Sequence, residues 1–147
     1  MRALSVVALA GMFRARRSRA ADAPEAPITD PCKLLTSAEA SAVLGAKIGA
    51  GEVTHPGPHP RCRFVTSSFD EIFIDVSDPA TMTAIVQSGG ATAVAGIGDQ
   101  AAWQHDTYSS ALFIEKGGNA VVLGVPRTIA TPTPAVQESA KLIASRM

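Results

Sequence analysis

Residues 30–39 read DPCKLLTSAE, and this stretch decides how the fold of the 147-residue chain begins. Thr36 and Glu39 have the spacing of a capping box, in which a hydroxyl and a carboxylate satisfy free amides of a first helical turn. The stretch therefore predicts a helix that starts after Thr36 and runs to Leu44. Gly45 follows at the position where a left-handed residue commonly ends a helix.

The rest of the chain alternates between strand and helix signals. Apolar residues recur at every second position in some segments, which is typical of half-buried strands, and at helical intervals in others. Strands are expected at 62–66, 71–76, 101–104, 110–116 and 119–125, and further helices at 79–88 and after the Thr-Pro cluster at 131–134. Gly117 and Gly118 suit a two-residue hairpin turn because both accept positive φ angles.

This order of elements predicts an α+β fold, a two-layer sandwich in which an antiparallel sheet carries helices packed on one face. The hydrophobic content of 46% and the charged content of 18% exclude a wholly disordered chain. Residues 28–147 are expected to form a single α+β domain, which is long enough to bury one core. Residues 1–27 are interpreted as a signal-like leader and linker.

The leader has the features of an export signal and two features that oppose one. An apolar run at 3–13 is too short to span a membrane but fits the core of a signal peptide, and ADA at 21–23 offers a cleavage site. Four arginines at 14–19 follow the apolar run, where positive charge opposes translocation. LAGM at 9–12 differs from a lipoprotein box by Met12, which stands where the lipidated cysteine would be. We expect a secreted or cell-envelope protein without a membrane span in the mature chain.

The distribution of charge excludes one class of partner. The formal net charge is zero, but five of the thirteen basic residues lie before residue 20, and all thirteen acidic residues lie after it. The remaining eight basic residues against thirteen acidic ones leave residues 20–147 with a balance of −5. An acidic domain lacks the positive surface that nucleic-acid binding requires, so no nucleic-acid partner is expected.

Several of these segments resemble a family. The opening at 30–36 (DPCKLLT), VLG at 43–45, Cys62 before an aromatic residue, VAGIGDQA at 94–101 and KG at 116–117 are similar to a group of small secreted actinobacterial-type lipoproteins of unknown function. The resemblance covers residues 28–147. It implies a structural disulfide and a lipidated leader cysteine, from which Met12 departs. It contributes no established catalytic residues.

Cys32 and Cys62 are the only cysteines of the chain. In a chain with an export-like leader, two cysteines favour a structural disulfide over catalysis or metal binding. The alternative is a metal site made by His55, His59 and the Cys62 thiolate. Prolines between and beside these histidines forbid helical spacing, and no acid lies among them. If Cys62 is in a disulfide its thiolate is unavailable, which leaves fewer than the three or four ligands that protein zinc sites use. We expect no metal site and no cofactor.

Three further patterns are weak as signs of chemistry. GIGDQA at 96–101 matches a dinucleotide-binding fingerprint, but the residues after it fit a strand and turn better than the required helix, so a tight loop is expected. His105 and Asp106 are adjacent, and adjacent residues of a strand point to opposite faces, which argues against an acid–base pair. Trp103 is expected to pack against the sheet. No catalytic residue is assigned.

The sequence therefore favours a non-enzymatic binding or interaction module of the cell envelope, whose partner is an unknown envelope protein or a small ligand. A pocket between the sheet and the helices would support that reading. One alternative is a structural or inhibitory envelope protein without a small-molecule site. Another is a small hydrolase, which would need a histidine to converge with an acid and a nucleophile.

Overall fold

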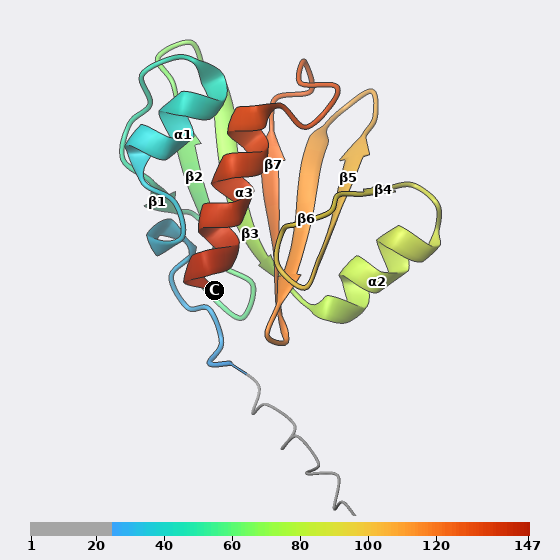
Figure 1. The fold of residues 1–147 in the computed structure, drawn as a ribbon. Helices are drawn as coiled ribbons and strands as arrows, with labels where there is room; N and C mark the ends of the chain where they lie inside the picture. Colours follow the sequence, from blue (N-terminus) through green and yellow to red (C-terminus); the bar gives the residue numbers. More distant parts are fainter. Residues whose placement is uncertain (1–24) are drawn as a thin grey trace, which may run out of the picture.

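The computed structural model describes residues 25–147, which form one seven-stranded antiparallel sheet with three α-helices and a short 3-10 helix (Figure 1). The elements are, in chain order, η1 (Pro31–Lys33), α1 (Ser37–Leu44), β1 (Glu52–Val53), β2 (Arg61–Val65), β3 (Glu71–Ser77), α2 (Pro79–Gln87), β4 (Thr92–Ala93), β5 (Gln100–His105), β6 (Ser110–Lys116), β7 (Asn119–Val125) and α3 (Pro134–Arg146). The strand order is β1-β2-β3-β7-β6-β5-β4. This confirms the predicted α+β fold, while the predicted signal sequence and its cleavage site lie outside the described residues.

The main core lies between the sheet and the two helices α1 and α3, which lie side by side on one face (Figure 1). Ile74, Leu112 and Leu123 point from neighbouring strands toward Ala140 and Ile143 of α3, and all five are fully buried. Alternate strand positions supply these residues because successive side chains of a strand point to opposite faces. Burial of this apolar surface is the main stabilising contribution to the fold.

Helix α2 packs on the opposite face of the sheet, which differs from the expectation that the helices share one face. Met82 of α2 forms a second apolar cluster with Ala111 and Phe113 of β6. These two residues alternate with Leu112 and Ile114, which belong to the main core. Strand β6 is therefore apolar on both faces, and α2 covers the face that points away from the main core.

The helix boundaries follow the predicted signals. The Thr36 hydroxyl accepts a hydrogen bond from the Glu39 amide at 3.3 Å, and the Glu39 carboxylate accepts one from the Thr36 amide at 2.8 Å, which completes the capping box. Gly45 ends α1 with a φ of 65°. Asp78 caps α2 in the predicted position by accepting the Thr81 amide.

An ion pair joins the start of α1 to the end of α3. Both Arg146 terminal nitrogens lie 2.7 Å from the Glu39 carboxylate oxygens, and one of them also donates to the Leu34 carbonyl at 3.0 Å. The Arg146 guanidinium is the largest cause that lowers the pKa of Glu39, to about 2. Two elements separated by about a hundred residues are thereby held in register.

Candidate functional site

The largest of five cavities described in residues 25–147 lies on the α3 side of the sheet, between the β4 segment, strand β5 and the chain that leads into α3. Its volume is about 600 Å³, within the range of roughly 300 to 1,000 Å³ typical of small-molecule sites. Small residues supply much of the wall: Gly90, Ala93, Ala95 and Ala130. We call this space the α3 cavity.

Trp103 forms the floor of the α3 cavity. Its side chain is 6% exposed and belongs to the main core, as expected from the sequence, while one edge lines the cavity. The indole N–H donates to the Ala130 carbonyl at 3.0 Å. This hydrogen bond satisfies the only polar atom of the ring and fixes the ring against the chain before α3.

Four polar side chains line the same cavity: Thr92, His105, Thr131 and Gln137. The Gln137 amide nitrogen donates to the Pro132 carbonyl at 3.0 Å, which leaves its carbonyl oxygen for another partner. His105 uses Nδ1 in a contact of 2.8 Å with the Ser110 hydroxyl. The cavity therefore combines the Trp103 ring with a few hydrogen-bonding groups, of which only His105 is ionisable.

The pairing of His105 with Ser110 was missed by the sequence interpretation, which considered Asp106 instead. The two residues are cross-strand partners in the β5–β6 register, so their side chains share a face. Locating the tip of that hairpin at 106–109 would have predicted the contact. Ser110 is 1% exposed, so its hydroxyl is covered by protein.

Asp106 faces its own turn and makes no hydrogen bond with His105 among the described residues, as the sequence predicted. Its carboxylate accepts the amides of Tyr108 at 2.7 Å and Ser109 at 2.8 Å. These backbone hydrogen bonds are the main causes that lower the pKa of Asp106. His105 and the Ser110 hydroxyl are thus in contact, whereas the Asp106 carboxylate stabilises the turn between β5 and β6.

Residues 96–99 of the glycine-rich segment form the expected tight loop. Strand β5 follows it, where the nucleotide fingerprint requires a helix. Gly98 has a φ of +57°, and a Cβ there would lie 2.5 Å from the Glu115 carbonyl oxygen. The Asp99 amide donates to the same carbonyl at 2.8 Å, and its carboxylate accepts the Gly117 amide at 2.8 Å.

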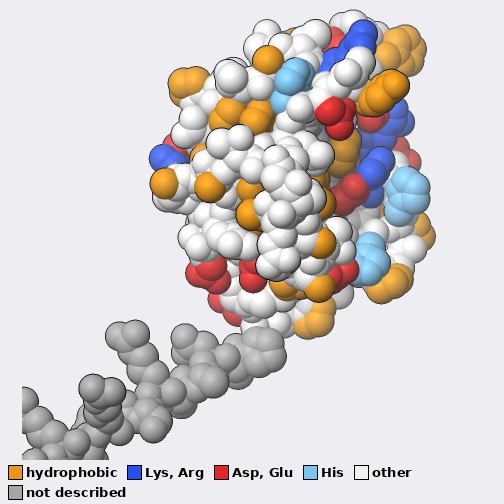
Figure 2. Space-filling model, turned by 90° about the vertical axis from the view of Figure 1, so that its right-hand side faces the viewer, with side chains coloured by type: hydrophobic (Ala, Val, Ile, Leu, Met, Phe, Trp, Pro, Cys, Tyr) orange, Lys and Arg blue, Asp and Glu red, His pale blue; other side chains and the backbone are white. Residues whose placement is uncertain are grey.

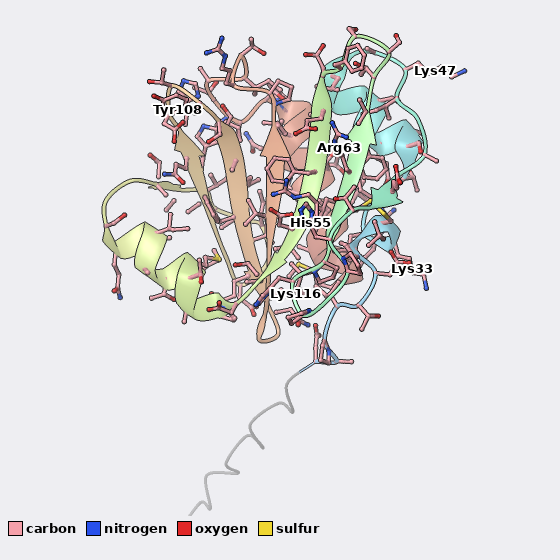
Figure 3. The ribbon with its side chains drawn as sticks, turned by 180° about the vertical axis from the view of Figure 1, so that it is seen from behind. Lys33, Lys47, His55, Arg63, Tyr108 and Lys116 are labelled. Carbon is pink, nitrogen blue, oxygen red and sulfur yellow. A yellow bond between two sulfur atoms is a disulfide. The ribbon has the colours of Figure 1, made fainter. Side chains whose placement is uncertain are left out.

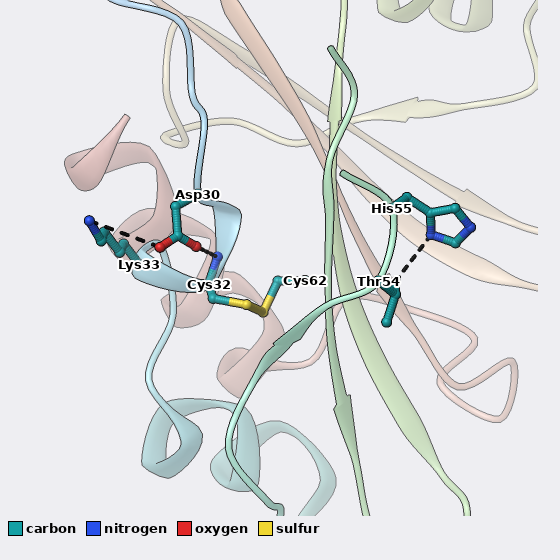
Figure 4. The surroundings of a disulfide bond; sticks show 6 residues. All are labelled: Asp30, Cys32, Lys33, Thr54, His55 and Cys62. Atoms are coloured by element: carbon teal, nitrogen blue, oxygen red, sulfur yellow. Dashed lines mark hydrogen bonds and ion pairs between the residues drawn. A yellow bond between two sulfur atoms is a disulfide. The ribbon is translucent and has the colours of Figure 1, made fainter. Parts of the chain in front are cut away.

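Cys32 and Cys62 form the predicted disulfide, with a Cα–Cα distance of 5.0 Å (Figure 4). The bridge joins η1 to β2, and Cys62 is fully buried. Gly51 packs so closely over the bridge that a Cβ there would lie 2.6 Å from the Cys62 sulfur. The cysteines are therefore structural, and neither offers a thiolate.

The histidines of the proline-rich loop lie apart from the disulfide. His55 Nδ1 contacts the Thr54 hydroxyl at 3.1 Å, and its ring points away from Cys62 (Figure 4). His55 and His59 line a second cavity of about 420 Å³. It lies on the face of the sheet opposite α3, where Figure 3 shows His55. Within residues 25–147, no three His, Cys, Asp or Glu side chains gather in a way that could hold a metal ion.

Ionic side chains line this second cavity, and they pair with each other. Two Arg61 nitrogens donate to the two carboxylate oxygens of Asp75, and the guanidinium lies 4.3 Å from the centre of the Phe73 ring. The Asp75 carboxylate is the main cause that raises the pKa of Arg61. The Phe73 ring lies flat over Gly124, where a Cβ would clash with it. These contacts with Asp75 and Phe73 account for the position of the Arg61 side chain in the wall of this cavity.

Two aromatic side chains are exposed at one end of the sheet. Phe69 is 84% exposed and Tyr108 is 89% exposed, and Phe69 has a φ of 65°, which is unusual for a residue other than glycine. Both precede strands, β3 and β6, that run in the same direction because each is antiparallel to β7. Figure 3 shows Tyr108 at this end of the sheet. Neither residue contributes to the core.

A scan against protein-family models found no match, and neither did searches of curated proteins and of solved structures. The resemblance to small secreted lipoproteins therefore stays a prediction. Among the helices of residues 25–147, none has the length and apolar character needed to cross a membrane.

Proposed function

We propose that this chain is a non-enzymatic binding module, secreted or held in the cell envelope, that accommodates a small ligand in the α3 cavity. The observation that carries the proposal is the cavity of about 600 Å³ between the sheet and α3, walled by Trp103 and small side chains. Natural ligand sites likewise combine apolar side chains with a few positioned polar groups.

Two observations support a binding role over hydrolysis. A hydrolase of the Ser-His type needs a nucleophile that substrate can reach, and the Ser110 hydroxyl beside His105 is almost fully buried. The triad logic also needs a group that orients the imidazole, and Asp106 hydrogen-bonds its own turn instead. The proposal therefore assigns no catalytic residue.

The extracytoplasmic location rests on separate grounds. The disulfide suits an oxidising compartment, because cytosolic thiols are usually kept reduced. The apolar run at 3–13 and the ADA sequence at 21–23 fit an export signal. Since Met12 replaces the lipobox cysteine, the proposal includes no lipid anchor.

An occlusion experiment tests the proposed site. The neutral probe N-phenylnaphthylamine is titrated into the full chain, and Trp103, the only tryptophan, reports binding through quenching of its emission. Ala95→Phe and Ala130→Phe place a bulky ring on the cavity wall at exposed positions, and each is expected to weaken probe binding at least tenfold. Ala42→Phe, on the exposed surface of α1, is the matched control and should bind like wild type.

The expected pattern requires that both cavity variants keep the wild-type circular dichroism spectrum and melting temperature. Equal probe affinity in wild type, Ala95→Phe and Ala130→Phe would place the binding elsewhere and contradict the proposal. The proposal would also be contradicted if wild type bound no probe at concentrations up to the solubility limit of the probe.

The exposed aromatics favour docking of a protein as a second candidate function. Phe69 combines a left-handed backbone with an exposed apolar ring, so neither local conformation nor burial accounts for a phenylalanine there. The backbone amide of Tyr108, at the same end, donates to Asp106, and aromatic side chains are typical anchors of interfaces. A protein from envelope fractions that binds wild type but not a Phe69→Asn, Tyr108→Ser variant would support this function. Equal capture by both proteins would contradict it.

A further inference from the structure

We infer that the ligand of the α3 cavity is an uncharged molecule with an apolar body and at least one hydrogen-bond donor. This inference rests on the proposed function and specifies the chemistry of the same site. Its basis is the charge of the cavity walls. None of the residues that line the α3 cavity is an aspartate, glutamate, lysine or arginine.

Four other cavities described among residues 25–147 differ in this respect. Each of these four cavities has at least one ionic side chain in its wall. One example from each is Arg61, Lys116, Asp99 and Asp70. Figure 2 shows the side of the molecule that lies at the right of Figure 1: uncharged side chains cover its centre, and charged side chains lie around the margin, at the top, along the right and at the lower left. The absence of ionic groups is thus a property of the α3 cavity and not of the surface in general.

A charged ligand would find no carboxylate, ammonium or guanidinium partner in this wall, whose one ionisable side chain is His105. An ion that leaves water without a partner loses hydration energy that uncharged dipoles replace only in part. A neutral ligand avoids that loss and gains from contact with Trp103 and the surrounding alanines. The cavity should therefore bind charged ligands more weakly than uncharged ones, and contacts with the apolar part of the ligand should supply most of the affinity.

The polar groups of the wall specify what the ligand should carry. The indole N–H is already bonded to Ala130, and the Gln137 amide nitrogen to Pro132. No hydrogen bond among residues 25–147 uses the Gln137 side-chain oxygen. An amide or hydroxyl donor on the ligand would fill that position, with the Thr92 and Thr131 hydroxyls as further uncharged partners.

A matched pair of probes tests the inference. N-Phenylnaphthylamine and anilinonaphthalene sulfonate share an aromatic skeleton and one N–H donor, and they differ by a single sulfonate. Dissociation constants for both are measured with the full-length wild type, and the neutral probe is expected to bind at least tenfold more tightly. His105→Asn, which removes the one ionisable side chain of the wall, should retain this preference.

Introducing a charge should reverse the preference. Gln137→Lys, or Thr131→Lys at an exposed position if the first variant folds poorly, places an ammonium in the wall and is expected to favour the sulfonate. Ala42→Lys adds the same charge on exposed α1 and should leave the ratio of the two affinities unchanged.

The outcomes separate this inference from the proposed function. If Ala95→Phe weakens both probes but wild type binds them equally or prefers the sulfonate, the cavity binds ligands and the inference of an uncharged ligand is overturned. If neither probe responds to Ala95→Phe or Ala130→Phe, the proposed function itself fails, and the inference fails with it. Preference for the neutral probe that Gln137→Lys does not alter would also overturn the inference, because the preference would then not arise in this wall.

Discussion

Loss of the disulfide between Cys32 and Cys62 is expected to lower the free energy of unfolding by about 3.5 to 4 kcal/mol. The bridge joins residues 30 apart in sequence, and the chain-entropy relation gives roughly that value for a closed loop of this size. This is a large share of the roughly 5 to 15 kcal/mol typical of a small domain. For a folded region of about 120 residues, it corresponds to a melting temperature about 10 to 15 °C lower.

Thermal unfolding followed by circular dichroism measures this effect in three samples: oxidised wild type, wild type in a phosphine reductant, and the Cys32→Ala, Cys62→Ala double variant. Reduced wild type is the matched control because it keeps both side chains and lacks only the bond. The double variant should melt at or slightly below the reduced protein, since Cys62 is fully buried and alanine leaves a small void. Melting temperatures within about 3 °C across the three samples would contradict this expectation, because the bridge would then not constrain the unfolded chain.

Three further predictions concern stability. Glu39→Gln should lower the free energy of unfolding, measured in urea at neutral pH, by about 1 to 2 kcal/mol. Because Arg146 lowers the pKa of Glu39 to about 2, the difference in stability between wild type and the variant should disappear as the pH falls from about 4.5 to 2. A difference that stays constant with pH would contradict this prediction. Gly98→Ala should destabilise by about 1 to 3 kcal/mol through its clash, and clearly more than Gly45→Ala, where φ is also positive but no atom lies within 4 Å. Phe69→Asn should stabilise by about 0.5 to 1 kcal/mol in thermal unfolding, and a loss of stability would show that the phenylalanine supports the fold.

Local signals in the sequence were sufficient for most of the fold. The capping box at Thr36, the proline after Asp78 and the glycine pair at 117–118 each act within a few residues, and the structure has the corresponding element at each. The disulfide was predictable because the chain has only two cysteines.

Features that depend on tertiary contacts were not predictable in the same way. Strands β1 and β4 have two residues each, too few for any periodic pattern, and exist only because a longer strand lies beside them. The position of α2 was missed because helical periodicity does not say which face of a sheet a helix will cover. The α3 cavity joins Gly90, Trp103 and Gln137, which are far apart in sequence, and only the folded chain brings them together.

Amide chemical-shift mapping is the most direct test of the claim that the α3 cavity is the ligand site. Labelled full-length protein is titrated with N-phenylnaphthylamine, and the shift of each backbone amide is followed to saturation. If the ligand binds in the α3 cavity, the largest changes should fall at 90–95, 103–105 and 130–137, together with the Trp103 indole N–H. Changes centred on 55–61 and 75–81, around the charged cavity of the opposite face, would contradict it, and so would small changes spread over the whole sheet.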